Sequence, residues 1–331
     1  MKQSDEPNAP SDLPRVLLHH SISAVHDDEF CQELRSRIES SVPTETSVQV
    51  ATTPDEFATN VGDAEVVLTN RPFDDELSAN PTLNWVQTLN SGVDFYDLDQ
   101  LSDMGITVTN ASGVASNPIA EQVLGYLIAF ERKIETAIRQ QENRGVWQKY
   151  AGGELNGNTV GVIGVGAIGT RVAELATAFG MEVIGTKRTP ATAPDVVDEI
   201  HPPSELPEVL RRSDYVVIAC PLVDSTYGLI GKEELMAMKS DAVLVNVGRG
   251  EIIDEQSLET ALQQDRIRGA ALDVFETEPL SPESILWDLP NVIITPHMAG
   301  STPKYAERVG ELFADNYNKY INNQKLSNQV I

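Results

Sequence analysis

The sequence of 331 residues has only two cysteines, Cys31 and Cys220, and no Cys-x-x-Cys pair. This scarcity excludes a disulfide framework and is typical of a reducing compartment. No cluster of cysteine and histidine has the spacing of a metal site, so we expect no metal. No apolar run approaches the ~20 residues that cross a bilayer, and residues 1–14 lack the features of a signal peptide. We therefore expect a cytoplasmic protein without a membrane partner.

Positive charge is also scarce. Lysine and arginine number 24 against 50 acidic residues, which gives a formal net charge of −26. Such a surface repels nucleic acid and anionic lipid, so neither is an expected partner. Repulsion among the carboxylates would weaken in salt, because the Debye length shortens to about 3 Å at 1 M. We interpret the composition as halophile-like, with an ordinary acidic enzyme as the alternative.

Short β-branched runs alternate with segments of helical periodicity. This rhythm predicts an α/β fold with parallel strands and helices on both faces of the sheet. The predicted strands are residues 15–20, 47–51, 65–69, 85–89, 106–110, 159–163, 181–186, 214–219, 242–247, 269–273 and 291–295. The predicted helices are residues 27–40, 54–61, 74–79, 117–144, 232–238, 254–264 and 302–322, besides one that ends at Gly180. Asn117 is the expected cap of the long helix at 117–144, and Asp254 caps the helix that follows it at 254–264.

A glycine-rich turn directly follows the strand at residues 159–163. It reads G-x-G-x-x-G and leads into the helix that ends at Gly180. In this context the first glycine permits a tight turn, the second admits a pyrophosphate, and the third lets the helix pack against the strand. The helix N-terminus favours the phosphate charge. The motif predicts a dinucleotide site formed by Gly164, Gly166, Ala167, Ile168 and Gly169, with a turn in some other α/β protein as the alternative.

The end of the next strand indicates which dinucleotide is bound. An NAD site normally has an acidic residue there, whereas a basic residue suits a 2′-phosphate. This chain has Lys187-Arg188-Thr189 and no acid. Because the guanidinium fork matches phosphate oxygens, we expect Arg188 to be the main contact and Lys187 and Thr189 to assist it. The sequence predicts a preference for NADP(H), with NAD(H) as a second cofactor; a solvated basic pair is the alternative.

Two loops in the first half follow predicted strands. Ser91, Gly92 and Val93 come after the strand at 85–89, where backbone N–H groups of small residues can bind an anion. A plain turn explains this loop equally well. Arg71 follows the strand at 65–69 and could reach an acidic substrate, although a surface position is more common for arginine.

Three polar residues follow strands in the second half. Arg249 can hold a carboxylate and polarise a keto oxygen. His297 can donate a proton to that oxygen as hydride reaches the carbon. Glu278 can bind the other ring nitrogen and fix the tautomer. Because ligands bind at the carboxyl ends of parallel strands, these residues predict hydride transfer to a 2-keto acid.

Several motifs together resemble the D-isomer-specific 2-hydroxyacid dehydrogenases. They cover nearly the whole chain and comprise residues 91–94, 164–169, 220–222, 246–250, 271–279 and 295–297. The resemblance implies two Rossmann-like domains with a cleft between them. One is a doubly wound dinucleotide-binding domain at residues 116–301. The other is a flavodoxin-like substrate domain made from residues 1–115 and 302–331.

The resemblance also implies residue roles. Arg249, Glu278 and His297 form the implied catalytic set, and the backbone at 91–93 binds the substrate carboxylate. Asp273 is expected to hold the nicotinamide carboxamide. The implied cofactor contacts beyond the glycine motif and the basic loop are Pro221, Thr226, Val247, Gly248, Arg249, Asp273, His297 and Gly300. A homodimer is the expected assembly.

Lys187 replaces the acid usual in the family, which resembles the NADP-using glyoxylate/hydroxypyruvate reductase branch. Glu278 stands where the formate dehydrogenase branch has glutamine, so formate is not the expected substrate. The sequence thus predicts an NADP(H)-dependent enzyme that reduces 2-keto acids to D-2-hydroxy acids. The alternative is a dinucleotide-sensing binding protein, because the family includes corepressors with the same fold.

Overall fold

The structure is a computed structural model that describes residues 13–73, 80–142, 144 and 147–331. The predicted helix at 74–79 lies outside these residues, as do residues 1–12. The chain divides into two compact units. Unit 1 comprises Met1–Val114 and Thr302–Ile331, and unit 2 comprises Ala115–Ser301. Within the described ranges, no helix is long and apolar enough to cross a membrane.

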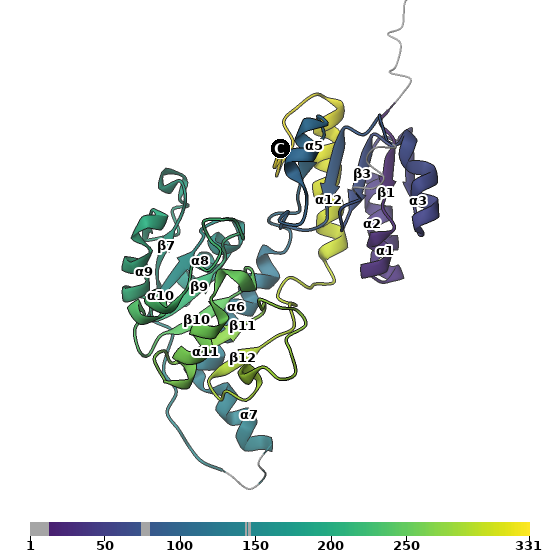
Figure 1. Ribbon diagram of the computed structural model, residues 1–331. Helices are drawn as coiled ribbons and strands as arrows, with labels where there is room; N and C mark the ends of the chain where they lie inside the picture. The colour runs from purple at the N-terminus through teal and green to yellow at the C-terminus, as the bar shows by residue number, and fades with distance from the viewer. Residues whose placement is uncertain (1–12, 74–79, 143, 145–146) are drawn as a thin grey trace, which may run out of the picture. The chain divides into compact units, whose positions relative to one another are not determined.

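Unit 1 contains a five-stranded parallel sheet (Figure 1). Its strand order is β2-β1-β3-β4-β5, the flavodoxin-like order. The strands are β1 (Val16–Leu18), β2 (Val48–Val50), β3 (Val66–Thr69), β4 (Trp85–Thr88) and β5 (Thr107–Thr109). The parallel sheet and the flavodoxin-like class predicted for this part are confirmed.

Helices cover both faces of this sheet because alternate strand residues point to opposite sides. Leu18 packs into a core with α2 (Asp28–Ser41) and α12 (Tyr305–Ile321). Leu17 packs into the opposite core, with α3 (Pro54–Asn60) and α5 (Leu98–Asp103). Figure 1 shows the yellow α12 among the purple and blue elements of the N-terminal half. Both ends of the chain therefore contribute to unit 1.

Unit 2 contains a seven-stranded parallel sheet in the order β12-β11-β10-β9-β6-β7-β8. Counted from β6, this is the Rossmann order with one further strand at the edge. The strands are β6 (Thr159–Ile163), β7 (Glu182–Thr186), β8 (Glu199–His201), β9 (Tyr215–Ile218), β10 (Val243–Asn246), β11 (Gly269–Leu272) and β12 (Val292–Ile294). The doubly wound class predicted here is also confirmed.

The helices of unit 2 also lie on both sides of its sheet. Leu210, Leu235 and Leu258 pack into one core with the strands, and they come from three successive helices. These helices are α9 (Leu206–Arg212), α10 (Lys232–Ala237) and α11 (Glu255–Gln263). Two further helices of the unit, α6 (Ser116–Arg132) and α8 (Ala167–Ala178), pack against each other.

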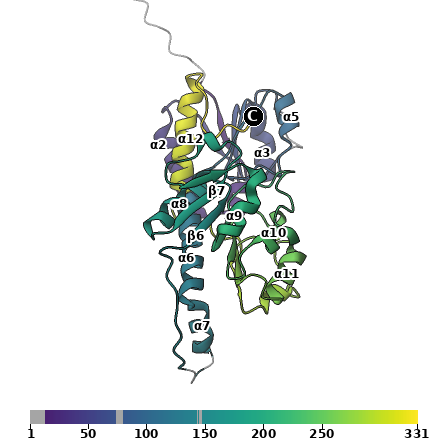
Figure 2. The same ribbon diagram turned by 90° about the vertical axis from the view of Figure 1, so that its left-hand side faces the viewer.

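The prediction of one long helix at 117–144 is wrong. The segment forms α6 and α7 (Ile134–Glu142), which are separated by Lys133 in the left-handed region at φ 54°. Side chains of Tyr215 and Arg268 bind Glu131 just before the break. Tertiary contacts therefore end the helix where periodicity alone continues it. In Figure 2, α7 extends beyond α6 away from the sheet of unit 2.

Asn117 is not the cap of α6, so that prediction is wrong as well. The helix begins one residue earlier, with Ala115 at the cap position. The Asn117 side chain instead donates to Glu121 at 2.7 Å and accepts from Arg171 at 2.9 Å. Asp254 does cap α11, since it accepts from the amide of Ser257 at 2.9 Å.

Among the described residues, three short α-helices and one short strand are missing from the sequence prediction. They are α1 (Ser21–Val25), α5, β8 and α9, none longer than seven residues. Elements this short carry too little periodicity to be recognised. Every predicted strand is present. Gly180, the predicted end of a helix, follows α8 with a φ of 75°.

Candidate active site

The glycine loop begins at the carboxyl end of β6. Gly164 has φ 95°, and a Cβ there would lie 2.7 Å from Cα of Cys220 at the end of β9. Only glycine therefore suits the position. The amides of Gly164 and Val165 donate to the carbonyl of Thr186 at 3.2 and 3.0 Å, which ties the loop to the end of β7.

The next two glycines of the motif have different surroundings. A Cβ on Gly169 would lie 2.4 Å from the Gly164 carbonyl oxygen, so α8 could not approach β6 as closely with any other residue. A Cβ on Gly166 would meet nothing within 4 Å. Gly166 and Ala167 are exposed at the start of α8, with Ile168 half-buried beside them. The space before the helix N-terminus is thus open, as phosphate binding requires.

The basic loop follows β7. The Lys187 ammonium donates to the Val165 carbonyl, so its charge is directed at the glycine loop rather than at solvent. Arg188 and Thr189 are exposed, and the Arg188 guanidinium has no partner in the described part of the chain. The Lys187 amide donates to His201 at 3.0 Å, so the unpredicted β8 supports the basic loop.

Loops from neighbouring strands close around the same edge of the sheet. The Thr226 hydroxyl donates to the Pro221 carbonyl at 2.7 Å and holds the turn after β9. Gly248 approaches the Cys220 carbonyl so closely that a Cβ would lie 3.0 Å away.

Burial raises the pKa of the Cys220 thiol to about 11, which keeps it protonated and unreactive near neutral pH. Val247 is buried, and Gly300 is half-buried beyond β12.

His297 and Glu278 are in direct contact. The Nδ1 atom of His297 lies 2.7 Å from Oε2 of Glu278. The other carboxylate oxygen accepts from the amide of Phe275 at 3.1 Å, so the carboxylate is held on both sides. The His297 side chain remains 52% exposed, and its Nε2 has no partner among the described residues. This arrangement fixes the ring orientation and leaves one nitrogen for a ligand.

Asp273 organises the loop that carries His297. It is 2% exposed and accepts hydrogen bonds from the amides of Met298 and Ala299 at 3.0 and 2.9 Å, besides the hydroxyl of Thr295. Its carbonyl accepts from the amide of His297 at 2.8 Å. These bonds support the left-handed conformation of His297 at φ 49°. Sequence reasoning assigned Asp273 to the nicotinamide and missed this role.

A signal for this role was available in the sequence. A carboxylate at the end of a buried strand needs several donors, and the nearest loop of adjacent β12 can supply them. Tyr126 extends the network, because its hydroxyl lies 2.5 Å from that of Thr295. Burial is the main cause that raises the pKa of Tyr126. The network therefore links α6 to the His297 loop.

Arg249 follows β10 in a loop that packs tightly against its neighbour. The Arg249 carbonyl accepts from the Asn246 side chain at 2.9 Å, and the guanidinium donates to the Gly248 carbonyl at 2.9 Å. A Cβ on Gly250 would lie 1.8 Å from the carbonyl carbon of Phe275. The structure thus brings the loops of Arg249, Glu278 and His297 together at the ends of β10, β11 and β12, on the edge that bears the glycine loop.

The predicted substrate loop lies in unit 1, after β4. The Ser91 hydroxyl donates to Ala111 at 3.2 Å, and the Ser91 carbonyl accepts from Asn110 at 2.7 Å. The amides of Ser91, Gly92 and Val93 donate to no acceptor in the described part of the chain. A fixed loop with three available donors suits an anion.

Arg71 lies after β3 on the same edge. Its backbone is held by Thr69, whose hydroxyl donates to the Arg71 carbonyl at 2.6 Å. The guanidinium is exposed and has no partner within the described residues. The loop conformation is therefore fixed, while the charge remains available.

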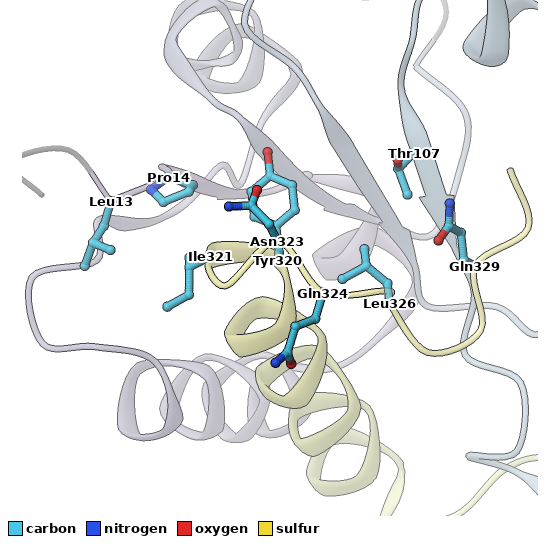
Figure 3. A pocket seen from close by; sticks show the side chains of 9 residues that line it. All are labelled: Leu13, Pro14, Thr107, Tyr320, Ile321, Asn323, Gln324, Leu326 and Gln329. Carbon is cyan, nitrogen blue, oxygen red and sulfur yellow. The ribbon is translucent and has the colours of Figure 1, made fainter.

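A separate cavity of about 500 Å³ lies at the opposite edge of the unit 1 sheet (Figure 3). Thr107 and Tyr320 line it, together with the residues before β1. Its other lining residues are Leu13, Pro14, Ile321, Asn323, Gln324, Leu326 and Gln329. It contains none of the predicted site residues.

Comparison with known proteins agrees with this geometry. The model of the D-isomer-specific 2-hydroxyacid dehydrogenase NAD-binding domain matches residues 124–299, which is more than half of the chain. The chain belongs to the D-isomer-specific 2-hydroxyacid dehydrogenases. It is thus an oxidoreductase of the NAD(P)-dependent type that acts on CH–OH donors.

Individual relatives span much of the chain. It is 32% identical to a glyoxylate/hydroxypyruvate reductase of Arabidopsis thaliana, with 100% of this chain and 99% of that protein covered. It is 34% identical to a D-3-phosphoglycerate dehydrogenase of Methanocaldococcus jannaschii over 86% of this chain, but only 55% of that longer protein. A family member from Xanthobacter autotrophicus, solved with NADPH and MES, has a TM-score of 0.85 at 29% identity and covers 97% of this chain and 98% of its own.

Proposed function

We propose that this protein is an NADP(H)-dependent reductase that converts 2-keto acids to D-2-hydroxy acids. The observation that carries the proposal is the contact of 2.7 Å between His297 and Glu278, on the edge that bears the open glycine loop. An imidazole held by a carboxylate, with its second nitrogen available, is suited to proton transfer during carbonyl reduction. Unit 2 is then the cofactor domain and unit 1 the substrate domain.

The residues divide the chemistry between them. Bound NADPH would supply hydride to the keto carbon. His297 donates the proton from Nε2 to the keto oxygen, and Glu278 stabilises the imidazolium that does so. Arg249 polarises the keto oxygen and opposes the charge that develops on it. In the reverse direction His297 accepts the same proton.

The substrate carboxylate binds to the amides of Ser91, Gly92 and Val93 in our proposal. Their lack of other acceptors supports this role. Arg71 lies on the same edge and adds a positive charge in a chain of net charge −26. An anionic substrate therefore meets fixed donors and one cation.

Arg188 binds the 2′-phosphate of NADP(H) in our proposal. It is exposed and has no competing partner within the described residues, whereas Lys187 is directed at the glycine loop. Lys187 then stiffens the loop rather than contacting the phosphate directly. The NADPH complex of the Xanthobacter relative shows that the family accommodates this cofactor.

The decisive experiment is reduction of a panel of 2-keto acids with NADPH and NADH in parallel, at molar salt. We expect turnover of at least one of glyoxylate, hydroxypyruvate and pyruvate, with kcat/KM higher for NADPH. Turnover with NADH alone would contradict the cofactor preference and keep the reaction. Tight NADPH binding with no turnover would favour the dinucleotide-sensing alternative.

We also propose a homodimer that involves α7. This helix has no buried residue, and Ile134, Ile138 and Trp147 on or beyond it are 42%, 54% and 93% exposed. Apolar side chains gathered on one projecting element are typical of an interface. Sedimentation in molar KCl should give twice the monomer mass, and Ile138→Glu should give the monomer. A monomeric wild type would contradict the proposal.

The acidic composition supports a salt-rich cytoplasm as the working environment. Several ion pairs of the described residues are exposed on both sides, so these pairs add little to stability and do little to offset repulsion among the carboxylates. The unfolding temperature should rise between dilute buffer and 2 M KCl. Equal stability in both would make the protein an ordinary acidic enzyme.

A further inference from the structure

The loop that we propose binds the substrate carboxylate is held through its carbonyl groups. Three successive carbonyls, those of Leu89, Asn90 and Ser91, each accept one hydrogen bond. Because a trans peptide unit is planar, a carbonyl held on one side directs the N–H of the next residue to the other side. The donor amides of the loop are therefore oriented by bonds that lie behind its backbone.

The three bonds come from two parts of unit 1. Two of them come from residues 110 and 111, just after β5, at 2.7 and 2.9 Å. The third comes from α12, since the hydroxyl of Tyr305 donates to the Leu89 carbonyl at 2.6 Å. Tyr305 is the first residue of that helix. The entry to the carboxylate loop is thus fixed by a side chain more than 200 residues further along the chain.

Tyr305 is itself held in place. Its ring stacks on Phe30 of α2, with ring centroids 6.4 Å apart. Its amide donates to the Thr302 carbonyl at 3.1 Å, which closes the turn before the helix. Further along α12, Val309 and Phe313 are buried in the core that this helix shares with α2, so the helix cannot rotate. The phenol therefore faces Leu89 in one orientation.

The Tyr305 hydroxyl is a permanent donor in this bond. A carbonyl oxygen can only accept, so the shared proton belongs to the phenol. Burial raises the pKa of Tyr305 to about 12, so the phenol keeps that proton at neutral pH. The bond to Leu89 therefore persists under the conditions of turnover.

We propose that Tyr305 is a positioning residue for the substrate carboxylate. Its bond to Leu89 fixes the start of the loop, so that the amides of residues 91–93 meet the anion already in place. A preorganised donor set loses less conformational freedom on binding than a mobile one does, so the bond lowers KM without contact with the substrate. This inference rests on the proposed reductase function. Because every 2-keto acid carries the carboxylate, Tyr305 acts on all of them alike.

The test is Tyr305→Phe, which removes the hydroxyl and keeps the ring. KM for glyoxylate, pyruvate and hydroxypyruvate should rise by one common factor, about 3- to 10-fold. The kcat and the Kd for NADPH should stay within about twofold of wild type, because unit 2 is unchanged. Steady-state kinetics at saturating NADPH and a cofactor titration measure these quantities.

The matched control is Tyr317→Phe. Tyr317 lies on the same helix, and its hydroxyl also donates to a backbone carbonyl, that of Pro14, at 2.9 Å. Pro14 precedes β1, at the opposite edge of the sheet from the carboxylate loop. Both variants should lose a similar amount of stability in denaturant unfolding, but Tyr317→Phe should keep the wild-type KM.

Each outcome separates this inference from the proposed function. An unchanged KM in Tyr305→Phe would overturn the inference and leave the reductase intact. A rise that differs between the three acids would mean that Tyr305 contacts the variable part of the substrate, and an equal rise in Tyr317→Phe would mean a general loosening of unit 1. Either result would also overturn the inference. Failure of the wild type to reduce any 2-keto acid would overturn the proposed function itself.

Discussion

The carboxyl edges of the two sheets are built by different means. In unit 2, loops approach each other so closely that Gly164, Gly169 and Gly250 leave no room for a Cβ. In unit 1, the edge is held by side chains that bind backbone, such as Asn90 and Asn110. The first kind of edge restricts three positions to glycine, and this pattern can be recognised in a single sequence. The second leaves its free groups on the backbone, so the sequence alone does not distinguish an anion-binding loop from a plain turn.

The largest expected effect concerns the acid/base pair of unit 2. His297→Ala should lower kcat by about 100- to 10,000-fold, because the keto oxygen loses its proton donor. His201→Ala is a matched control, since His201 also contacts a glutamate, Glu205, at 2.9 Å. Steady-state reduction with NADPH measures both. Comparable turnover in His297→Ala and wild type would remove His297 from the mechanism.

The second prediction concerns the tight edge itself. Gly250→Ala should lower the free energy of unfolding by about 3 kcal/mol or more, because its Cβ must displace the Phe275 backbone. Gly125→Ala in α6 meets nothing within 4 Å and should be neutral or stabilise by about 0.5–1 kcal/mol. Denaturant unfolding in molar salt compares the two. Similar denaturant midpoints for the two variants would contradict the close approach of Gly250 to the Phe275 backbone.

A smaller effect is expected at the basic loop. Arg188→Ala should weaken NADPH binding about 10- to 100-fold, because a charge-assisted contact to the 2′-phosphate is lost. Binding of NADH, which has no such phosphate, should change little. Fluorescence titration of both cofactors gives the comparison. Equal weakening of NADPH and NADH would assign Arg188 to something other than the phosphate.

The smallest effect belongs to unit 1. Ser91→Ala removes a hydroxyl bonded to Ala111 at 3.2 Å but leaves the amide in place. Because recognition by backbone does not need the side chain, KM should change less than about threefold. A change as large as that of a catalytic residue would mean that the hydroxyl itself touches the substrate. The unit 1 edge would then recognise its ligand through a side chain, and the proposed difference between the two edges would be wrong.

Sequence reasoning reached the parallel strands of both sheets and the pairing of His297 with Glu278, and the family resemblance added the class of each sheet. These depend on glycine geometry, strand periodicity and complementary chemistry, all of which residue type records. It failed at Lys133, where contacts of Glu131 with distant residues end the helix, and at β8, a half-exposed edge strand of three residues. A buried carboxylate at a strand end does imply several donors, but residue type does not identify those of Asp273, because two of them are the backbone amides of Met298 and Ala299. Contacts between distant segments and bonds to backbone leave little trace in a single sequence.

The position of α12 has a consequence for biosynthesis. Phe313 and Tyr317 of this helix are fully buried in the core of unit 1, although most of that unit precedes residue 115. Unit 2 is one continuous segment and can fold while the ribosome is still at work. The core of unit 1 is incomplete, with one face of its sheet uncovered, until α12 has been synthesised. The net charge of −26 would oppose association between copies of such an incomplete unit.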